Sequence, residues 1–273
     1  MEFKTLEFLI QSLLTKENSI TNFTYEWNDE IIIDDITYSY KNWKDIEDEN
    51  LLKEMKLTQE LIASLVQSSK LKVLCLRGNF FGDLGAKLIF DELKKENTNL
   101  SIINLFNNSL TDECIPSFCE MILVNNKLEE INFGKNFLTD ESLKLIGKNY
   151  GRFKMTHEEI EEYKKLEKER NDIIKQNAKL KAGKKPELEV PHIDELKEIE
   201  GVIYRVKNDV LKLFNLTQNN FTEKSFDDLI GILDGLPDTM VTVDDKSYNE
   251  EQKNQLTDTQ NPAGYYNRIY LLK

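Results

Sequence analysis

Two histidines and three cysteines are the residues of this sequence whose types could do acid–base or nucleophilic chemistry. His157 or His192 could act as a general base or bind a metal, and a cysteine beside either could act as a nucleophile. Both histidines, however, fall in a highly charged stretch that predicts a surface helix without a pocket. A Ser/His/Asp or Cys/His site is therefore not expected.

The cysteines and glycines have spacings that favour structural roles. Cys75, Cys114 and Cys119 are odd in number and lack paired C-x2-C spacing, so they fit neither a disulfide framework nor a zinc site. We expect buried, unreactive thiols in a reducing compartment. A glycine group at 78–85 matches neither phosphate-loop motif, and a turn with close helix packing explains it. The sequence therefore predicts no enzyme, no cofactor, no metal and no small-molecule substrate.

Charge and hydropathy exclude further classes of protein. The chain has 273 residues, of which 40% are hydrophobic, and a formal net charge of −13 at pH 7. That apolar content is enough to bury a core, and the negative charge disfavours binding to nucleic acid. No stretch approaches the roughly 20 apolar residues of a membrane-spanning helix, and the amino-terminal apolar run indicates an amphipathic capping helix. We expect a cytoplasmic protein that binds neither nucleic acid nor membranes.

The segments that contain the three cysteines belong to a repeat of about 28 residues. Each copy opens with the pattern L-x-x-L-x-L-x-x-N. The four sets are Leu71, Leu74, Leu76 and Asn79; Leu100, Ile103, Leu105 and Asn108; Leu128, Ile131, Phe133 and Asn136; and Leu211, Phe214, Leu216 and Asn219. Alternate residues of a short strand point to one side, and the Asn side chain can bond backbone groups where the chain turns away.

The second half of each copy changes to helical spacing. Thr111 and Thr139, each followed by Asp-Glu, provide a hydroxyl N-cap and carboxylates at the positive end of a helix. Each copy is therefore predicted to be a strand, a turn and a helix.

This pattern resembles the leucine-rich repeat family, in particular its ribonuclease-inhibitor-like class. The resemblance covers roughly Leu52 to Leu236 apart from one interruption. It implies an α/β solenoid with short parallel strands on a concave face and helices on a convex face. Degenerate copies are expected to flank the clear ones: one from Leu52 in "LLKEMKLTQELIASLV", and a closing strand at Val241 and Val243. "EIIIDDITYSY" predicts a capping strand or hairpin.

The interruption separates the third and fourth copies by about 55 extra residues, too many for a simple loop. Thr156 and Glu159 form a predicted capping box, and Gly183 suits a helix end, which predicts one helix of about 26 residues. Acidic residues dominate its first half and lysines its last turns. "KKPELEVPHIDEL" is predicted to be a connector, and "EGVIYRVKN" an extra strand leading back into the array.

These features divide the chain into four parts: residues 1–51 as an N-terminal cap, 52–153 as leucine-rich repeats, 154–205 as the charged helical insertion with its return strand, and 206–273 as the final repeat and C-terminal cap. The order of residues 244–263 is left open. The inserted helix either lies on the solenoid or docks on a neighbouring protein. Its candidate contact residues are Tyr163, Leu166, Ile173, Lys179, Lys181, Lys184 and Lys185.

The outward positions of the strands form the second candidate site, on the concave face. Counted from the repeat register, the candidate residues are Val73, Cys75, Arg77, Ile102, Asn104, Phe106, Glu130, Asn132, Leu213 and Asn215. Several of these are apolar groups on an exposed face, which indicates an interaction surface.

The resemblance implies a non-enzymatic scaffold that binds several other proteins in one large complex. Repeat proteins of this class with charged helical insertions look like components of the cytoskeleton of motile cilia, including dynein-regulatory and radial-spoke proteins. The axoneme is therefore the expected location. One alternative is a regulator of a small GTPase, because Ran GTPase-activating proteins share this fold class, although they carry a long acidic tail and more repeats. A ribonuclease inhibitor or intracellular sensor is opposed by the cysteine-poor repeats and the missing nucleotide-binding module.

Overall fold

The computed structural model describes residues 8–12, 14, 20–26, 30–33, 36–39, 49–68, 70–79, 81–95, 98–182, 186–191, 193, 195–199, 201–208, 210–235, 238–260 and 267–272. They belong to two compact units. The first unit is Met1–Tyr150 together with Asn208–Lys273, and the second is Gly151–Lys207. The second unit thus begins before, and ends after, the predicted 154–205 segment.

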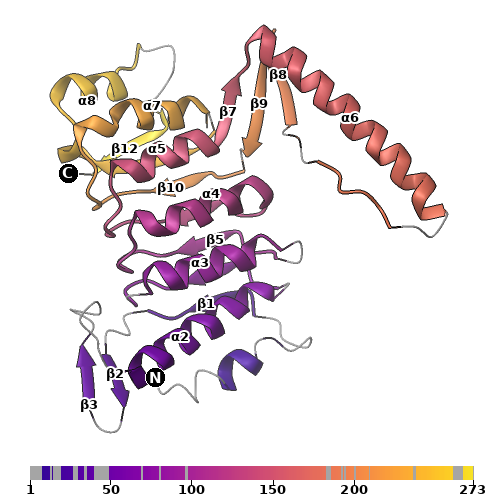
Figure 1. Ribbon diagram of the computed structural model, residues 1–273. Helices are drawn as coiled ribbons and strands as arrows, with labels where there is room; N and C mark the ends of the chain where they lie inside the picture. Colours follow the sequence, from indigo (N-terminus) through magenta and orange to yellow (C-terminus); the bar gives the residue numbers. More distant parts are fainter. Residues whose placement is uncertain are drawn as a thin grey trace. The chain divides into compact units, whose positions relative to one another are not determined.

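The first unit is built on a parallel sheet, in which seven strands of the described residues pair in the order β1-β4-β5-β6-β10-β11-β12 (Figure 1). The strands are β1 (Asn22–Thr24), β4 (Val73–Cys75), β5 (Ile102–Asn104), β6 (Glu130–Asn132), β10 (Leu213–Asn215), β11 (Met240–Asp244) and β12 (Ile269–Leu272). Although the second unit separates them in sequence, β6 pairs directly with β10, in the register that also joins β5 to β6.

Helices follow the strands and stack in chain order on one side of the sheet (Figure 1). They are α2 (Glu49–Ser64), α3 (Gly82–Leu93), α4 (Ile115–Val124), α5 (Asp140–Asn149), α7 (Phe226–Gly235) and α8 (Glu250–Thr257), with short 3-10 helices η2 (Leu65–Gln67), η3 (Asp112–Cys114), η4 (Glu223–Ser225) and η5 (Asp245–Ser247). A parallel sheet with helices on one face is the α/β arrangement expected from the repeat.

The core of the first unit lies between the sheet and these helices. The middle residues of the repeat strands are fully buried: Leu74, Ile103, Ile131 and Phe214. Phe90 of α3, Phe118 of α4, Phe133 after β6 and Phe214 of β10 form a cluster in which ring centroids lie between 5.2 and 6.1 Å apart. Because its members come from successive copies, this cluster joins the copies on both sides of the interruption.

The asparagines of the repeat bond the backbone at the turns, which confirms their predicted role. Asn108 is fully buried, and its Nδ2 donates to the carbonyls of Leu76 at 2.8 Å and Phe106 at 3.1 Å. Its Oδ1 accepts from the backbone N–H of Phe81 at 3.1 Å. Asn136 makes the equivalent bonds one copy further on, with the carbonyls of Leu105 and Gly134 and the N–H of Leu110. Each asparagine therefore ties its own turn to the preceding copy.

The helix starts carry a second set of bonds that the sequence analysis missed. The predicted threonine caps are confirmed: the hydroxyl oxygens of Thr111 and Thr139 each accept from the backbone N–H two residues on. In addition, each cap hydroxyl donates to an aspartate of the preceding copy. The pairs are Thr111 with Asp83 at 2.7 Å, Thr139 with Asp112 at 2.6 Å, and Thr222 with Asp140 at 2.6 Å.

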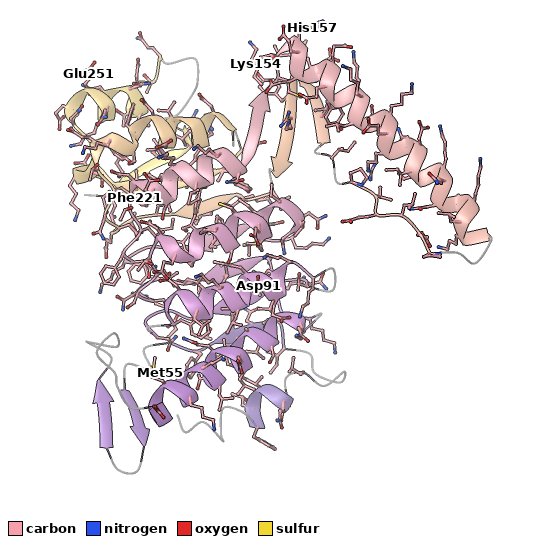
Figure 2. The ribbon with its side chains drawn as sticks, viewed as in Figure 1. Met55, Asp91, Lys154, His157, Phe221 and Glu251 are labelled. Atoms are coloured by element: carbon pink, nitrogen blue, oxygen red, sulfur yellow. The ribbon has the colours of Figure 1, made fainter. Side chains whose placement is uncertain are left out.

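The strand expected from Leu52 is wrong, because this segment is helix α2, to which Met55 belongs (Figure 2). Leucine, lysine and glutamate favour helices, and the three-residue spacing of Leu52 and Met55 matches one face of a helix as well as the opening of the repeat pattern. Leu52 is 44% exposed. The strand at this end of the sheet is β1, which pairs with β4 in parallel.

Other flanking elements agree with expectation. β2 (Glu30–Ile33) and β3 (Ile36–Ser39) pair as an antiparallel hairpin. The expected closing strand at Val241 and Val243 is β11, in which both residues are fully buried. Residues 8–12 form helical turns, with Ile10 fully buried. Beyond β11, a capping box from Asn249 starts α8 within the segment whose order was left open, and 261–266 lie outside the described residues.

The second unit contains α6 (His157–Ala182), β7 (Gly151–Lys154), β8 (Glu195–Ile199) and β9 (Val202–Asn208). Its helix begins after Thr156 with the predicted capping box: Thr156 N–H donates to Glu159 Oε2 at 2.8 Å, and Glu159 N–H to Thr156 Oγ1 at 3.3 Å. Gly183 lies outside the described residues.

The strands of the second unit correct two expectations. Part of the expected connector is strand β8, and the expected return strand β9 joins β7 and β8 in a sheet of order β7-β9-β8, not the parallel sheet of the first unit. β8 and β9 form an antiparallel hairpin whose turn uses Gly201 at φ 78°. Alternating apolar residues predict a strand but not its partner, and here the glycine turn places the partner next in sequence.

Candidate functional site

The face of the sheet opposite the helices, here called the open face, carries the residues predicted for the concave face. In β4, β5, β6 and β10 the middle residue is buried and the residues on either side of it are half-buried. Successive side chains of a strand alternate between faces, so the first and third residues lie on the open face. The strand register aligns them in two rows.

From β4 to β11 the first row is apolar except at its centre, and its positions are, in order, Val73, Ile102, Glu130, Leu213 and Met240. Met240 is 47% exposed and the other four are half-buried, so part of each side chain reaches solvent. Beyond Val73 the row ends on β1 at exposed Asn22. The carboxylate of Glu130 lies between two pairs of apolar side chains. Met240 was missed as a site residue, although its place in the alternating segment before Val241 is the signal that could have found it.

The second row is polar and consists of Cys75, Asn104, Asn132, Asn215 and Thr242. The Oδ1 atoms of the three asparagines accept hydrogen bonds from the backbone N–H two residues further on, at 3.0, 2.9 and 3.0 Å. Because an N–H donor requires an oxygen, these bonds fix the orientation of each amide. Within the described residues, their Nδ2 groups make no hydrogen bond. The row therefore presents a ladder of N–H donors.

Cys75 is half-buried rather than buried, which corrects one expectation. Its thiol donates to Glu26 Oε1 at 2.6 Å. Burial, followed by this hydrogen bond, raises the pKa of Cys75 to about 11, so the thiol is protonated at neutral pH and is a weak nucleophile. Cys114 and Cys119 are buried as expected. Burial and the neighbouring Asp83 raise the pKa of Cys114 well above its ordinary value.

Arg77 and Phe106 lie just beyond the strands on the same face. The guanidinium carbon of Arg77 is 5.0 Å from the centroid of the Phe106 ring, a cation–π distance. A Cβ atom added to Gly134 would lie 2.9 Å from this ring, so a larger residue there would displace Phe106. Exposed Arg77 keeps a cation on the open face.

The candidate residues of α6 lie in the second unit. Leu166 is 47% exposed, Tyr163 and Ile173 are half-buried, and Lys179 and Lys181 are exposed. Lys184 and Lys185 lie outside the described residues.

The return chain lies against the second half of α6. Asn177, which is buried, donates from Nδ2 to the carbonyl of Leu188 and accepts its N–H at Oδ1, both at 2.7 Å. The sequence analysis missed this pair of hydrogen bonds, although a single asparagine within an apolar helical stripe indicates a buried polar contact. Part of the predicted contact stripe is therefore used within the second unit itself.

The remaining chemistry-bearing residues do not gather into a reactive site. Across the described ranges, no group of three or more His, Cys, Asp or Glu side chains could hold a metal ion. His157 starts α6, near Lys154 at the end of β7 (Figure 2), and His192 lies outside the described residues. None of the described helices combines the length and the apolar character needed to cross a bilayer.

No known protein-family model matches the chain. Three curated proteins are similar to part of it. NACHT, LRR and PYD domains-containing protein 3 of Bos taurus is 33% identical over 86 residues, protein 14 of Homo sapiens 30% over 89, and protein 4B of Mus musculus 31% over 88.

The matched segments cover 32%, 33% and 32% of this chain but only 8%, 8% and 10% of those relatives. Together with the parallel sheet and its helices, this similarity supports a fold of the leucine-rich repeat type.

Proposed function

We propose that this protein is a non-enzymatic scaffold, a leucine-rich repeat solenoid of the ribonuclease-inhibitor-like class that binds another protein on its concave, open face. The observation that carries the proposal is the pair of aligned rows, one apolar with a central Glu130 and one of oriented amide donors. Apolar groups beside donors whose geometry is already fixed suit a protein surface, because little side-chain entropy is lost when they bind.

The size of the surface favours a macromolecule over a small ligand. Five strands spaced by about 4.8 Å extend over roughly 19 Å. A small ligand is usually held in an enclosed cavity, whereas the rows form a long, open array. The Arg77–Phe106 pair adds a cation and an aromatic ring, which are residue types enriched in protein interfaces.

The second unit is proposed as an insertion into the solenoid that provides a further contact region. Leu166 offers an exposed apolar side chain, and Lys179 and Lys181 offer exposed cations at the end of α6. Two separate contact regions in one chain suit a scaffold that joins several proteins. The proposed setting is a cytoskeletal assembly, the axoneme of motile cilia, and it is supported by the resemblance of the charged helical insertion alone.

Affinity capture from extracts of ciliated cells tests the proposal with two charge-introducing variants. Leu213→Arg alters the open face, whereas Leu84→Arg alters the helix side at a residue that is 49% exposed. We expect Leu84→Arg to retain tubulin, dynein or radial-spoke proteins and Leu213→Arg to lose them. Circular dichroism should show that both variants are folded.

Equal retention of these proteins by both variants would contradict binding through the open face. Capture of none of them by the wild type would exclude the ciliary setting. Acceleration of GTP hydrolysis by a captured small GTPase would favour the Ran GTPase-activating-protein-like alternative instead.

A further inference from the structure

We propose that the open face binds an amphipathic helix that carries one lysine or arginine at the centre of its apolar stripe. This inference rests on the proposed function, because it names the class of partner that the open face takes. It is derived from the order of residues in the first row and the donors of the second row.

The spacing of the rows favours a helix over an extended chain. Neighbouring strands are about 4.8 Å apart, and a partner that crosses them must present side chains at a similar interval. Side chains on one face of a helix recur about every 5.4 Å along the axis, whereas those on one face of an extended strand recur about every 6.8 Å. Over the four intervals of the row, a helix drifts by about 2 Å and an extended strand by about 8 Å. A helix therefore stays in register with all five positions.

The negative charge of Glu130, at the centre of the row, indicates which residue the partner helix carries at its centre. Glu130 lies on β6, with Val73 and Ile102 on one side and Leu213 and Met240 on the other. Within the described part of the chain, the Glu130 carboxylate makes no ion pair or hydrogen bond.

Two cations of the same group of strands and turns already have partners. Lys212 pairs with Glu129 at 2.9 Å, and Arg77 lies over Phe106. Covering Glu130 with an apolar partner would desolvate an unpaired carboxylate, which is costly. A basic residue of the partner at this point removes that cost, and the net charge of −13 favours the approach of a basic segment.

The second row determines what flanks the apolar stripe. Because Asn104, Asn132 and Asn215 use Oδ1 for their own backbone, they offer N–H donors to a ligand. The flank of the helix beside this row should therefore carry acceptors such as Gln, Asn or Glu. The complete pattern is a basic residue at position i, apolar residues three or four and seven positions away on each side, and acceptors along one flank. A helix of about 15 residues, from seven positions before the basic residue to seven after it, covers the row.

Three synthetic helical peptides test this inference against the full chain. All have the same leucine stripe and glutamine flank, and they differ at the central position, which is lysine, glutamate or norleucine. Fluorescence anisotropy of labelled peptides gives the affinities. We expect the lysine peptide to bind the wild type at least tenfold more tightly than the glutamate peptide.

Two variants of Glu130 make the test specific. Glu130→Lys should reverse the preference, and Glu130→Gln, which keeps the shape of the side chain, should reduce it to less than about twofold. Glu113→Lys is the matched control, because it makes the same charge change in η3, at an exposed residue on the helix side of the sheet whose carboxylate, like that of Glu130, makes no ion pair within the described residues. It should leave the preference unchanged.

Equal binding of the three peptides to the wild type, or an equal effect of Glu130→Lys and Glu113→Lys, would overturn the inference. Failure of all three peptides to bind, while capture from extracts still depends on Leu213, would also overturn it and leave the proposed function standing. If no peptide binds and capture from extracts does not depend on Leu213, both the inference and the proposed function are rejected.

Discussion

In the first unit, hydrogen bonds and ring contacts join residues of successive copies, whereas in the second unit the ion pairs of α6 join residues three positions apart. Asn108 bonds the backbone of the preceding copy, and Phe118 touches rings from three other copies. In α6, Lys164 pairs with Glu161 at 2.7 Å and Lys175 with Asp172 at 3.6 Å. Such exposed pairs contribute little to stability.

Because of this difference, we expect the two units to respond differently to substitution. A change at one copy of the first unit removes contacts of its neighbours as well, because each copy completes the core and the turns of the next. A change on α6 removes local contacts. Matched substitutions in the two units therefore test whether their stability differs in this way.

The largest effect is expected for Phe118→Ala. The substitution leaves a cavity among the rings of Phe90, Phe133 and Phe214, and should lower the free energy of unfolding by about 3–5 kcal/mol. Chemical denaturation followed by circular dichroism measures it. Leu166→Ala on α6, at a residue that is 47% exposed, is the comparison and should cost less than about 1 kcal/mol. Similar losses for the two variants would remove the distinction between the units.

A smaller loss is expected for Asn108→Ala, which leaves buried backbone groups of two copies without their partners. The free energy of unfolding should fall by about 2–3 kcal/mol. Asn126→Ala, at an exposed position, is the control and should change the free energy of unfolding by less than about 0.5 kcal/mol.

Asn177→Ala is the corresponding substitution in the second unit. It removes the two hydrogen bonds to Leu188, so faster hydrogen exchange should be confined to residues around Leu188. Faster exchange across the first unit in Asn177→Ala would contradict the comparison.

The junction between the third and fourth copies is tested by Tyr150→Phe. The hydroxyl of buried Tyr150 accepts the backbone N–H of Leu211 at 2.9 Å. Removing it leaves that N–H unpaired, and should lower the free energy of unfolding by about 1–2 kcal/mol. The exchange rate of the Leu211 amide, measured by NMR, should rise. An unchanged rate would show that the bond does not hold the two sides of the junction together.

The smallest effect is a pH dependence at Asp112. Partial burial alone would raise its pKa, but hydrogen bonds from Ser142 and Thr139 outweigh burial and hold the pKa below its ordinary value of 3.8. A carboxyl group whose folded pKa is lowered stabilises the fold above the ordinary value, and this stabilisation is lost as the pH falls through the folded pKa.

The difference in unfolding free energy between the wild type and Asp112→Asn should therefore be largest near pH 6 and shrink below about pH 4. Thermal unfolding across this range measures it, with exposed Glu113→Gln as the neighbouring control. A difference for Asp112→Asn that stays constant with pH would contradict the stabilising role of the ionised carboxylate.

Much of the local structure could be predicted from residue spacing because it depends on near neighbours. The strand, turn and helix of each clear copy follow from alternation and helical periodicity, and the capping box at Thr156 from two residues three positions apart. The error at Leu52 has the same origin. A strand of three residues carries little pattern of its own, so it cannot be distinguished by spacing from the start of a helix such as α2.

The sequence predicted which residues lie at the candidate site better than it predicted the hydrogen bonds that they make. Alternation along each strand identified Val73, Ile102 and Leu213 as open-face residues. It could not show that Asn104 uses its oxygen for the backbone, or that the Cys75 thiol meets Glu26, because these depend on turn geometry and on a distant segment.

The repeating unit, its buried positions and its asparagine turns follow from the order of the amino acids, since these features depend on periodicity along the chain. The pairing of β6 with β10, the place of Glu130 between apolar residues of neighbouring strands, and the separate sheet of β7, β8 and β9 are visible only in the folded chain, because strand pairing is non-local. The partner of a strand is chosen by the packing of the whole unit, and spacing within one segment does not specify it.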